Sequence, residues 1–189
     1  CIDVIELSGQ FKIAGIIEND KSINQGRLGY PIIGTDDNLH NLRKKYTYAL
    51  IAVGQIKSAK TRIGLYQQLF EKMHYSLPVI ISPRAYVSNH ARIGDGTVVM
   101  HDAIVNANAK VGKNCIINNK VLIEHDAIIG DHCHIATGAI VNGEVAIGNE
   151  SFIGSGTVLK QSISIGKNCV IGAGIFVKRD IEPDQVIKK

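Results

Sequence analysis

The chain of 189 residues carries a net charge of +4, and 45% of its residues are hydrophobic. This length suits one domain or two small ones, and no apolar run approaches the roughly 18 residues that a membrane span needs. The charge is diffuse, without a basic stripe interleaved with aromatic residues, which excludes nucleic acid as the expected partner. No signal-peptide pattern opens the chain, so we expect a cytoplasmic protein that is not bound to a membrane.

Residues 1–82 alternate between helix and strand patterns. Apolar runs bounded by turn residues predict strands over 11–17, 30–34, 48–54 and 77–82. Helices are expected over 2–7, from the N-cap Thr35 to Leu42, and from the N-cap Ser58 to Met73. This alternation predicts a small Rossmann-like domain with a parallel sheet. Because a helix is already under way at Cys1, we expect the first strand and its turn to precede this chain.

From residue 83 to residue 189 the pattern has a period of six. Sixteen aliphatic residues recur at this spacing without a slip, from Val87 through Ile93 and Val99 to Val177, and a small residue precedes most of them by two positions. The motifs IGDGT, VGKNC, IGDHC, IGNES and IGKNC recur every eighteen residues. Six-residue repetition is the signature of a β-solenoid, so residues 83–189 are predicted to form a triangular parallel β-helix. Resemblance to known hexapeptide proteins implies the left-handed form.

The register of this repeat assigns an environment to each cysteine. Cys115, Cys133 and Cys169 fall on the inward small position, which predicts buried thiols and not metal ligands. His132 falls on a corner of the prism, where we expect a solvated side chain.

His125 and His134 lie nine residues apart, which is half a coil. Within one chain their side chains are expected to project in different directions and to meet only across a subunit boundary. His125 is a candidate general base, because imidazole titrates near neutral pH and the adjacent Asp126 can fix its tautomer. The alternative is a corner histidine that merely faces solvent.

Four segments carry a resemblance to a known family: GIIENDKS, GYPIIGTDDNL, IAVGQIKSAKTRI and VLIEHDAIIGDHCHIATGAIVNGEVAIG. With them the chain resembles the sialic acid O-acetyltransferases of the NeuD type and their relatives, the N-acetyltransferases of UDP-linked 4-amino sugars. The resemblance implies a homotrimer that needs no metal. It also implies acetyl transfer from acetyl-CoA to a hydroxyl or amine of a sialic-acid-like or nucleotide-activated amino sugar in surface glycan biosynthesis. Members usually end in a Gly-x-Pro-Ala-Lys tail, which we expect beyond this chain.

The same resemblance implies roles for particular residues. His125 would be the catalytic base and Asp126 its partner, and His134 or a backbone N–H would stabilise the oxyanion. The positions expected to bind acetyl-CoA are His134, Asn118, Gly154, Ser155, Gly172 and Ala173. Those expected to bind the sugar substrate are Glu18, Asn19 and Gly54. The CoA phosphates could meet any of Lys160, Lys167, Lys178 and Arg179.

Two other functions stay open. A zinc-dependent hydro-lyase of the γ-carbonic-anhydrase type would need three histidines across a trimer interface, and His101, His125 and His134 are the candidates. A non-catalytic scaffold that binds a sugar nucleotide would neither bind nor consume acetyl-CoA. Bound zinc would distinguish the first, and thiol release from acetyl-CoA would exclude the second.

Overall fold

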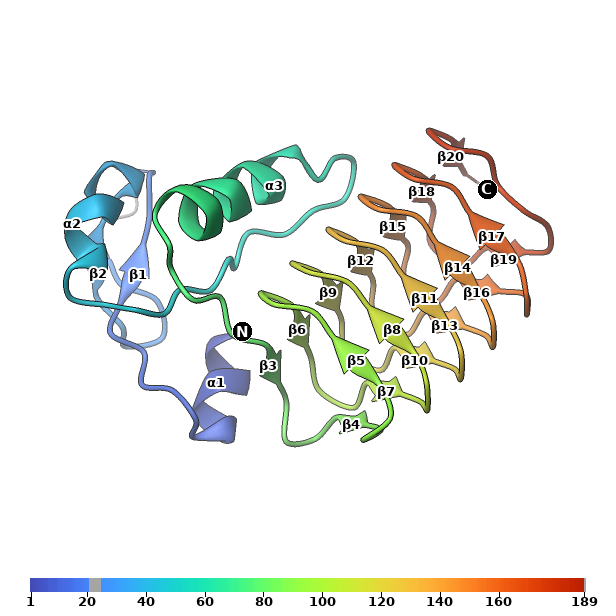
Figure 1. Cartoon of the computed structure of the whole chain (residues 1–189), viewed down its shortest axis with the longest axis horizontal. Helices are drawn as coiled ribbons and strands as arrows, with labels where there is room; N and C mark the ends of the chain where they lie inside the picture. Colours follow the sequence, from blue (N-terminus) through green and yellow to red (C-terminus); the bar gives the residue numbers. More distant parts are fainter. Residues whose placement is uncertain (21–24, 189) are drawn as a thin grey trace.

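The computed structural model describes residues 1–20 and 25–188, and it divides into an irregular first half and a long regular prism (Figure 1). The first half holds a two-stranded parallel sheet of β1 (Ile16–Ile17) and β2 (Ile32–Gly34). Its helical segments are α1 (Ile2–Ser8), η1 (Asp36–Asn38), α2 (Leu39–Arg43), α3 (Lys60–Tyr66) and η2 (Gln67–Lys72). This half is a reduced Rossmann-like unit, as predicted.

The predicted helices are present, and Thr35 is the N-cap of η1 as expected. The predicted N-cap Ser58 stands one residue before the observed N-cap of α3, Ala59. The Thr35 N–H donates to Asn38 Oδ1 at 2.9 Å in a capping box. Ser58 Oγ accepts a bond from the Lys60 N–H at 3.2 Å, just before α3. Of the strand predicted over 11–17, only the last two residues form a strand, as β1.

The strand predicted over 48–54 is wrong. Within the described residues, this segment makes one isolated bridge, from Tyr48 to Ser76. Its carbonyls at Ile51 and Val53 instead accept bonds from the Arg62 guanidinium. Of residues 48–54 only Ile51 is buried, and a side chain from α3 takes the place of a neighbouring strand.

The second half is a parallel β-helix with three sheets, and it is left-handed as expected. Sheet 1 holds β3 (Ile80–Ile81), β6 (Val98–Val99), β9 (Ile116–Ile117), β12 (His134–Ile135), β15 (Phe152–Ile153), β18 (Val170–Ile171) and β20 (Val186–Ile187). Sheet 2 holds β4 (Tyr86–Val87), β7 (Ile104–Val105), β10 (Leu122–Ile123), β13 (Ile140–Val141), β16 (Val158–Leu159) and β19 (Phe176–Val177). Sheet 3 holds β5 (Arg92–Ile93), β8 (Lys110–Val111), β11 (Ile128–Ile129), β14 (Ala146–Ile147) and β17 (Ser164–Ile165).

The register confirms the predicted repeat. Each strand from β4 to β19 ends on one of the sixteen aliphatic residues, and pairing joins positions eighteen apart, such as Ile123 with Val141. These side chains form one continuous core along the prism axis. The last coil is two residues shorter, because Val170 pairs with Val186. β3, predicted to close the first half, pairs with β6 and starts sheet 1; the division between residues 82 and 83 stays a prediction.

The inward column of small residues is also confirmed. Cys115, Cys133 and Cys169 are free thiols with no exposed surface. Their backbone N–H groups donate to the inward residue of the preceding coil: Cys115 to Thr97 Oγ1 at 2.9 Å, and Cys169 to Ser151 Oγ at 3.0 Å. These thiols are therefore packing residues, and none is available to a ligand.

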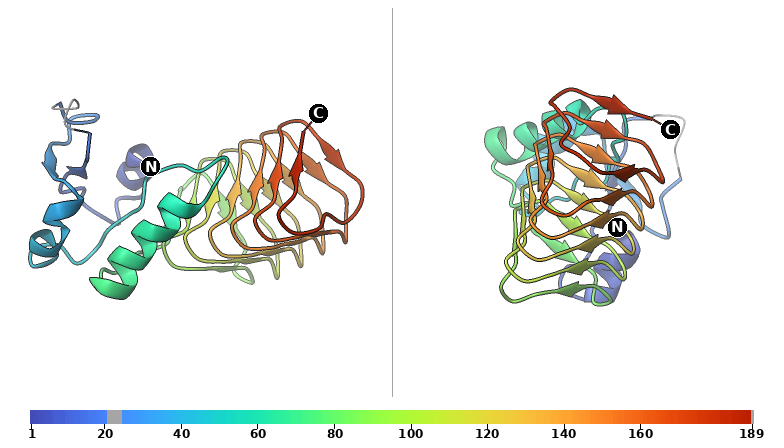
Figure 2. Two further views of the ribbon diagram at one scale, coloured as in Figure 1. Left: turned by 90° about the horizontal axis from the view of Figure 1, so that it is seen from above. Right: turned by 90° about the vertical axis from the view of Figure 1, so that its right-hand side faces the viewer.

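The first half covers the outer face of sheet 1 over the first coils (Figures 1 and 2). From α1, Val4 and Ile5 pack against Ile80 and Val98. From α3, the Tyr66 ring packs edge-on against the His132 ring, with centroids 5.4 Å apart. The prediction of a solvated His132 corner is wrong, because α3 covers that corner. No helix in the described part of the chain is long and apolar enough to cross a membrane.

Candidate active site

His125 lies on the prism edge between sheets 2 and 3, directly after β10, with 54% of its side chain exposed. Its Nδ1 lies 2.8 Å from Asp126 Oδ2. The other oxygen of Asp126 accepts a bond from Asn108 Nδ2 at 2.5 Å. A carboxylate can only accept, so Nδ1 of His125 carries the hydrogen and Nε2 keeps a free lone pair. Asn108, Asp126 and His125 thus form a short chain of hydrogen bonds that ends in a proton acceptor.

The electrostatics of this chain suit general base catalysis. The hydrogen bond that His125 donates to Asp126 raises the pKa of His125 above its ordinary value. Hydrogen bonds from Asn108 and then from His125 lower the pKa of Asp126. Asp126 therefore stays ionised at neutral pH and makes His125 a stronger base, which is the arrangement that proton removal from an attacking amine or hydroxyl needs.

Gly143 and Asn108 are two neighbours of His125 and Asp126 that sequence reasoning missed. A Cβ on Gly143 would lie 2.9 Å from both Cε1 and Nε2 of His125, so only glycine leaves the ring in this place. The signal was available, because Gly143 follows His125 by one eighteen-residue coil and Asn108 precedes Asp126 by one coil. Residues one coil apart stack directly upon each other in a β-helix.

His134 lies on β12 in sheet 1, where the first half buries it to 9% exposure. Its Nδ1 is 2.6 Å from the backbone carbonyl oxygen of Gln55, and its Nε2 is 3.4 Å from Asn118 Nδ2. Burial lowers the pKa of His134. Since a carbonyl only accepts, Nδ1 carries the hydrogen of the neutral ring and Nε2 is an acceptor. This tautomer offers no donor to an oxyanion, which favours the alternative of a backbone N–H.

A cavity of about 190 Å³ lies between the first half and sheet 1. Gly54, Asn118 and His134 line it together with Arg62, and most of the remaining wall is apolar: Ile51, Ala52, Val98, Met100 and Ile116. Small-molecule sites typically combine such a wall with a few convergent polar groups. The structure thus brings together three of the residues that the sequence assigned to acetyl-CoA and to the sugar substrate.

The remaining acetyl-CoA candidates lie in later coils, along the same edge of sheet 1 as Asn118. Gly154 and Gly172 occupy the phase of Asn118 in later coils, and Ser155 and Ala173 follow them at the corner. A Cβ on Gly154 would lie 2.5 Å from the Ala173 backbone nitrogen, so the coils stack closely only because glycine stands there. Gly154 itself is buried, and its N–H donates to the Ile171 carbonyl at 2.8 Å, whereas Ser155 and Ala173 are exposed on this edge.

Glu18 and Asn19 lie elsewhere, at the end of β1, and neither lines the cavity. The Asn19 amide is bonded to Asp36, through Nδ2 to Oδ2 at 2.6 Å and through Oδ1 from the Asp36 N–H at 2.8 Å. His125 and Asp126 are also apart from the cavity, on a different edge of the prism. Of the described residues, no contact joins His125 to His134, so a site using both needs a second copy of the chain.

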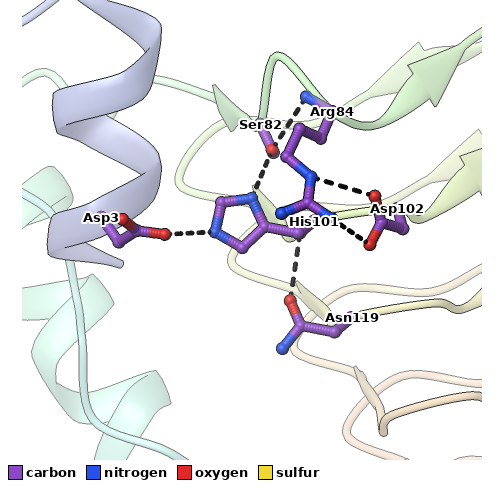
Figure 3. A network of polar contacts seen from close by, with 6 residues as sticks. All are labelled: Asp3, Ser82, Arg84, His101, Asp102 and Asn119. Atoms are coloured by element: carbon purple, nitrogen blue, oxygen red, sulfur yellow. Dashed lines mark hydrogen bonds and ion pairs between the residues drawn. The ribbon is translucent and has the colours of Figure 1, made fainter.

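His101 is engaged in a separate network that ties α1 to the first coil (Figure 3). Its Nδ1 lies 2.7 Å from Ser82 Oγ, and its Nε2 lies 2.6 Å from Asp3 Oδ2. Ser82 is buried and Asn119 Oδ1 accepts the His101 N–H at 3.1 Å. Both ring nitrogens of His101 are thus occupied. In residues 1–20 and 25–188, no cluster of three His, Cys, Asp or Glu side chains is arranged to hold a metal.

Comparison with protein families matches three models to this chain. The PglD N-terminal domain matches residues 1–69. The bacterial transferase hexapeptide model matches 90–125 and 108–143, and the hexapeptide repeat of succinyl-transferase matches 144–179. A search of curated proteins finds no match.

Solved structures match over nearly the whole chain. The acetyltransferase domain of PglB from Neisseria gonorrhoeae, in complex with acetyl coenzyme A, is 30% identical, with a TM-score of 0.88 over 97% of this chain and 88% of that one. PerB from Caulobacter crescentus, in complex with CoA and GDP-perosamine, is 28% identical, with a TM-score of 0.90 over 98% and 86%. WeeI from Acinetobacter baumannii, at 23% identity and a TM-score of 0.85 over 99% and 91%, shares the fold. The chain belongs to the hexapeptide-repeat acetyltransferases that carry a PglD-type N-terminal domain.

Proposed function

We propose that this protein transfers the acetyl group of acetyl-CoA to the amine of a nucleotide-linked amino sugar used in surface glycan biosynthesis. The observation that carries the proposal is the bonded chain from Asn108 through Asp126 to His125, which makes an exposed imidazole a stronger base. The relatives with bound acetyl coenzyme A, and with CoA and GDP-perosamine, support the donor and the acceptor class. A sialic-acid-like acceptor and transfer to a hydroxyl are the second possibility, which rests on the sequence resemblance.

In the proposed reaction the amine attacks the thioester carbonyl carbon while His125 Nε2 takes its proton. A backbone N–H stabilises the oxyanion, because the neutral His134 ring has no hydrogen at Nε2. The C–S bond then breaks, the CoA sulfur leaves with the proton from His125, and the acetamide remains on the sugar. Asp126 holds Nδ1–H throughout and stabilises the imidazolium that forms.

We propose a homotrimer whose active sites lie between subunits and a cytoplasmic location. The separation of His125 from the edge that carries Asn118, Gly154 and Gly172 supports the first point, because one prism presents them on different edges. Exposed apolar side chains on sheets 2 and 3, including Ile104 and Ile128, support an interface there. The free thiols support a reducing compartment.

A thiol-release assay with acetyl-CoA tests the function. We expect turnover with UDP- or GDP-linked 4-amino sugars and a loss of turnover in His125→Ala. Turnover with nonulosonic acids alone would move the acceptor to the sialic acid class. No thiol release with any acceptor would favour the scaffold, and activity that depends on stoichiometric zinc would favour the hydro-lyase.

Co-expression of two inactive chains tests the shared site. His125→Ala and His134→Ala each remove one side of the proposed intersubunit site. Mixed trimers should regain activity, because some interfaces then carry both intact histidines. Two variants that stay inactive when mixed, in trimers shown to contain both chains, would place the whole site within one subunit.

A further inference from the structure

Arg62 is a buried cation whose partners are all neutral. It is 1% exposed on α3, and its pKa falls to about 10 because burial disfavours the charge, so it remains protonated at neutral pH. Nη1 donates to the carbonyls of Ile51 at 2.9 Å and Val53 at 2.7 Å. Nη2 donates to the Asn114 carbonyl at 3.1 Å and to its Oδ1 at 2.6 Å. Of the ion pairs between described residues, none includes Arg62.

Arg62 therefore holds two parts of the molecule together. Ile51 and Val53 belong to the segment 51–55, which runs along the cavity, and Asn114 belongs to a corner of the prism. Asn114 also donates a hydrogen bond, from Nδ2 to the Arg62 carbonyl at 3.2 Å. The planar guanidinium presents several donors in one rigid fork, so it can bridge carbonyls on both sides where an ammonium group could not.

The segment 51–55, which Arg62 anchors, ends at Gln55, and Gln55 bonds to His132 and His134. The Gln55 side chain donates from Nε2 to the His132 carbonyl at 2.8 Å, and the Gln55 carbonyl accepts from His134 Nδ1 at 2.6 Å. His132 and Asn114 are also joined, with Nδ1 and Nδ2 3.0 Å apart. The contacts thus close a ring that runs from Arg62 through Asn114 and the two histidines and back along the segment 51–55.

Stability alone does not explain this ring. Burying a charge without a carboxylate is costly, and apolar replacements of buried ionic groups are often neutral or stabilising. The ring also leaves two buried polar atoms, Arg62 Nε and Gln55 Oε1, without a hydrogen-bond partner among the described residues. What the ring does achieve is a defined place for the Gln55 carbonyl, and that carbonyl decides which nitrogen of His134 carries the hydrogen.

We infer that Arg62 is a positioning residue for His134: by anchoring the segment 51–55 to Asn114, it keeps the Gln55 carbonyl on Nδ1 and presents the Nε2 lone pair to the cavity. In the free protein the Asn118 amide is a distant partner of this nitrogen, at 3.4 Å, and the ligand group that replaces it is an N–H or O–H donor of a bound substrate. The inference rests on the proposed function only for the identity of that substrate. The tautomer of His134 is a property of the free protein and is measured without turnover.

The test compares Arg62→Lys with the matched control Arg84→Lys, whose arginine pairs with Asp102 at an exposed site. Two-bond nitrogen–proton spectra of ¹⁵N-histidine-labelled protein report which ring nitrogen is protonated. In the wild type and in Arg84→Lys we expect His134 to be protonated at Nδ1 alone. In Arg62→Lys we expect both tautomers, a His134 pKa closer to its ordinary value, and a kcat/KM lower by about 10- to 100-fold, the cost of misplacing a reacting group by about 1 Å.

A folded Arg62→Lys protein that keeps the single Nδ1–H tautomer would overturn the inference. If Arg62→Lys does not fold, Asn114→Gly gives a second test, because Asn114 has a φ of 52° that glycine adopts freely. This change removes the side-chain bonds of Asn114 to Arg62 and to His132, and it keeps the bond from Arg62 to the carbonyl of residue 114. An unchanged tautomer there would also overturn it. A tautomer change in a protein that releases no thiol from acetyl-CoA would support the inference and contradict the proposed function instead.

Discussion

His125 and His134 are nine residues apart on the same β-helix, yet their surroundings differ in every respect. His125 is exposed on a prism edge, and a carboxylate raises its pKa. His134 is buried under the first half, and that burial lowers its pKa. Both carry the hydrogen on Nδ1, but one is held by an anion and the other by a neutral carbonyl. The two histidines thus share a tautomer in different surroundings, and we propose that one acts as a base and the other as a neutral acceptor.

The largest expected effect comes from removing the base. His125→Ala should lower kcat/KM by about 100- to 10,000-fold, the usual contribution of general base catalysis, with little change in thermal stability because the side chain is exposed. Steady-state thiol release measures the loss. His90→Ala is the matched control, since His90 is an exposed histidine on an earlier coil and should behave as the wild type. Full activity in His125→Ala would remove the distinction between the two histidines.

Asp126→Asn should weaken the base without removing it. The expected loss in kcat is about tenfold, below the usual contribution of general base catalysis. The pH profile gives the sharper result. The neutral form of His125 is the active one, and Asp126 raises its pKa, so the acid limb of the kcat profile should move to lower pH in the variant. A limb that stays in place, or moves to higher pH, would contradict the role of Asp126.

Asn108→Gly extends this comparison one residue further from the reaction, and glycine is chosen because Asn108 has a φ of 60° that alanine adopts only with strain. Loss of the Asn108 bond should raise the pKa of Asp126 and free its carboxylate to rotate away from His125. We expect a smaller shift of the acid limb in the same direction as for Asp126→Asn. Asn106→Ala is the control, because its amide bonds Glu124 and not Asp126. Equal profiles for the two variants would deny Asn108 a positioning role.

Gly143→Ala tests how closely the site is packed. The added Cβ would lie 2.9 Å from the His125 ring, which can move because it is the end of an exposed side chain. Thermal stability should therefore hardly change. We expect kcat to fall by less than about 100-fold, which is the cost of misplacing a reacting group by 1 Å. Gly138→Ala is not a useful control because its φ of 67° is strained for alanine, so Gly64→Ala, with open space at its Cβ, serves instead.

The smallest effect is expected at His101. Asp3→Asn weakens the hydrogen bond between His101 Nε2 and the exposed Asp3 carboxylate, and should cost about 1 kcal/mol of stability, the net contribution of a typical hydrogen bond. Chemical denaturation measures it, and kcat should stay at the wild-type value. If the wild type contains bound zinc and Asp3→Asn loses most of its activity, His101 would again be a candidate metal ligand.

The prism could be predicted from the sequence because its register is enforced at every position. Each aliphatic residue, each inward thiol and each corner is set by hydrogen bonds to the coil eighteen residues away, so one counted period fixes the environment of Cys133 as well as that of His125. The same count would have found Gly143 and Asn108, whose neighbours lie one coil away. In a β-helix, residues that contact each other in space are one repeat apart in the sequence, so the sequence pattern alone predicts these contacts.

The first half could be predicted only in part. Its helices followed from caps and periodicity, but the segment 48–54 has the composition of a strand and ends up bonded to Arg62. The burial of His132 and His134 was also out of reach, because it depends on where α3 and the segment 51–55 lie against the prism.

The sequence by itself thus determined the β-helix, the inward cysteines and the adjacent His125–Asp126 pair. Only the tertiary structure decided which nitrogen of His134 faces the cavity, and that Arg62 holds the segment responsible. The physical reason is the range of the contacts. Repeat contacts recur at a constant separation that can be counted, whereas the bonds from Arg62 to Asn114 and from His134 to Gln55 join residues 52 and 79 positions apart with no period to reveal them.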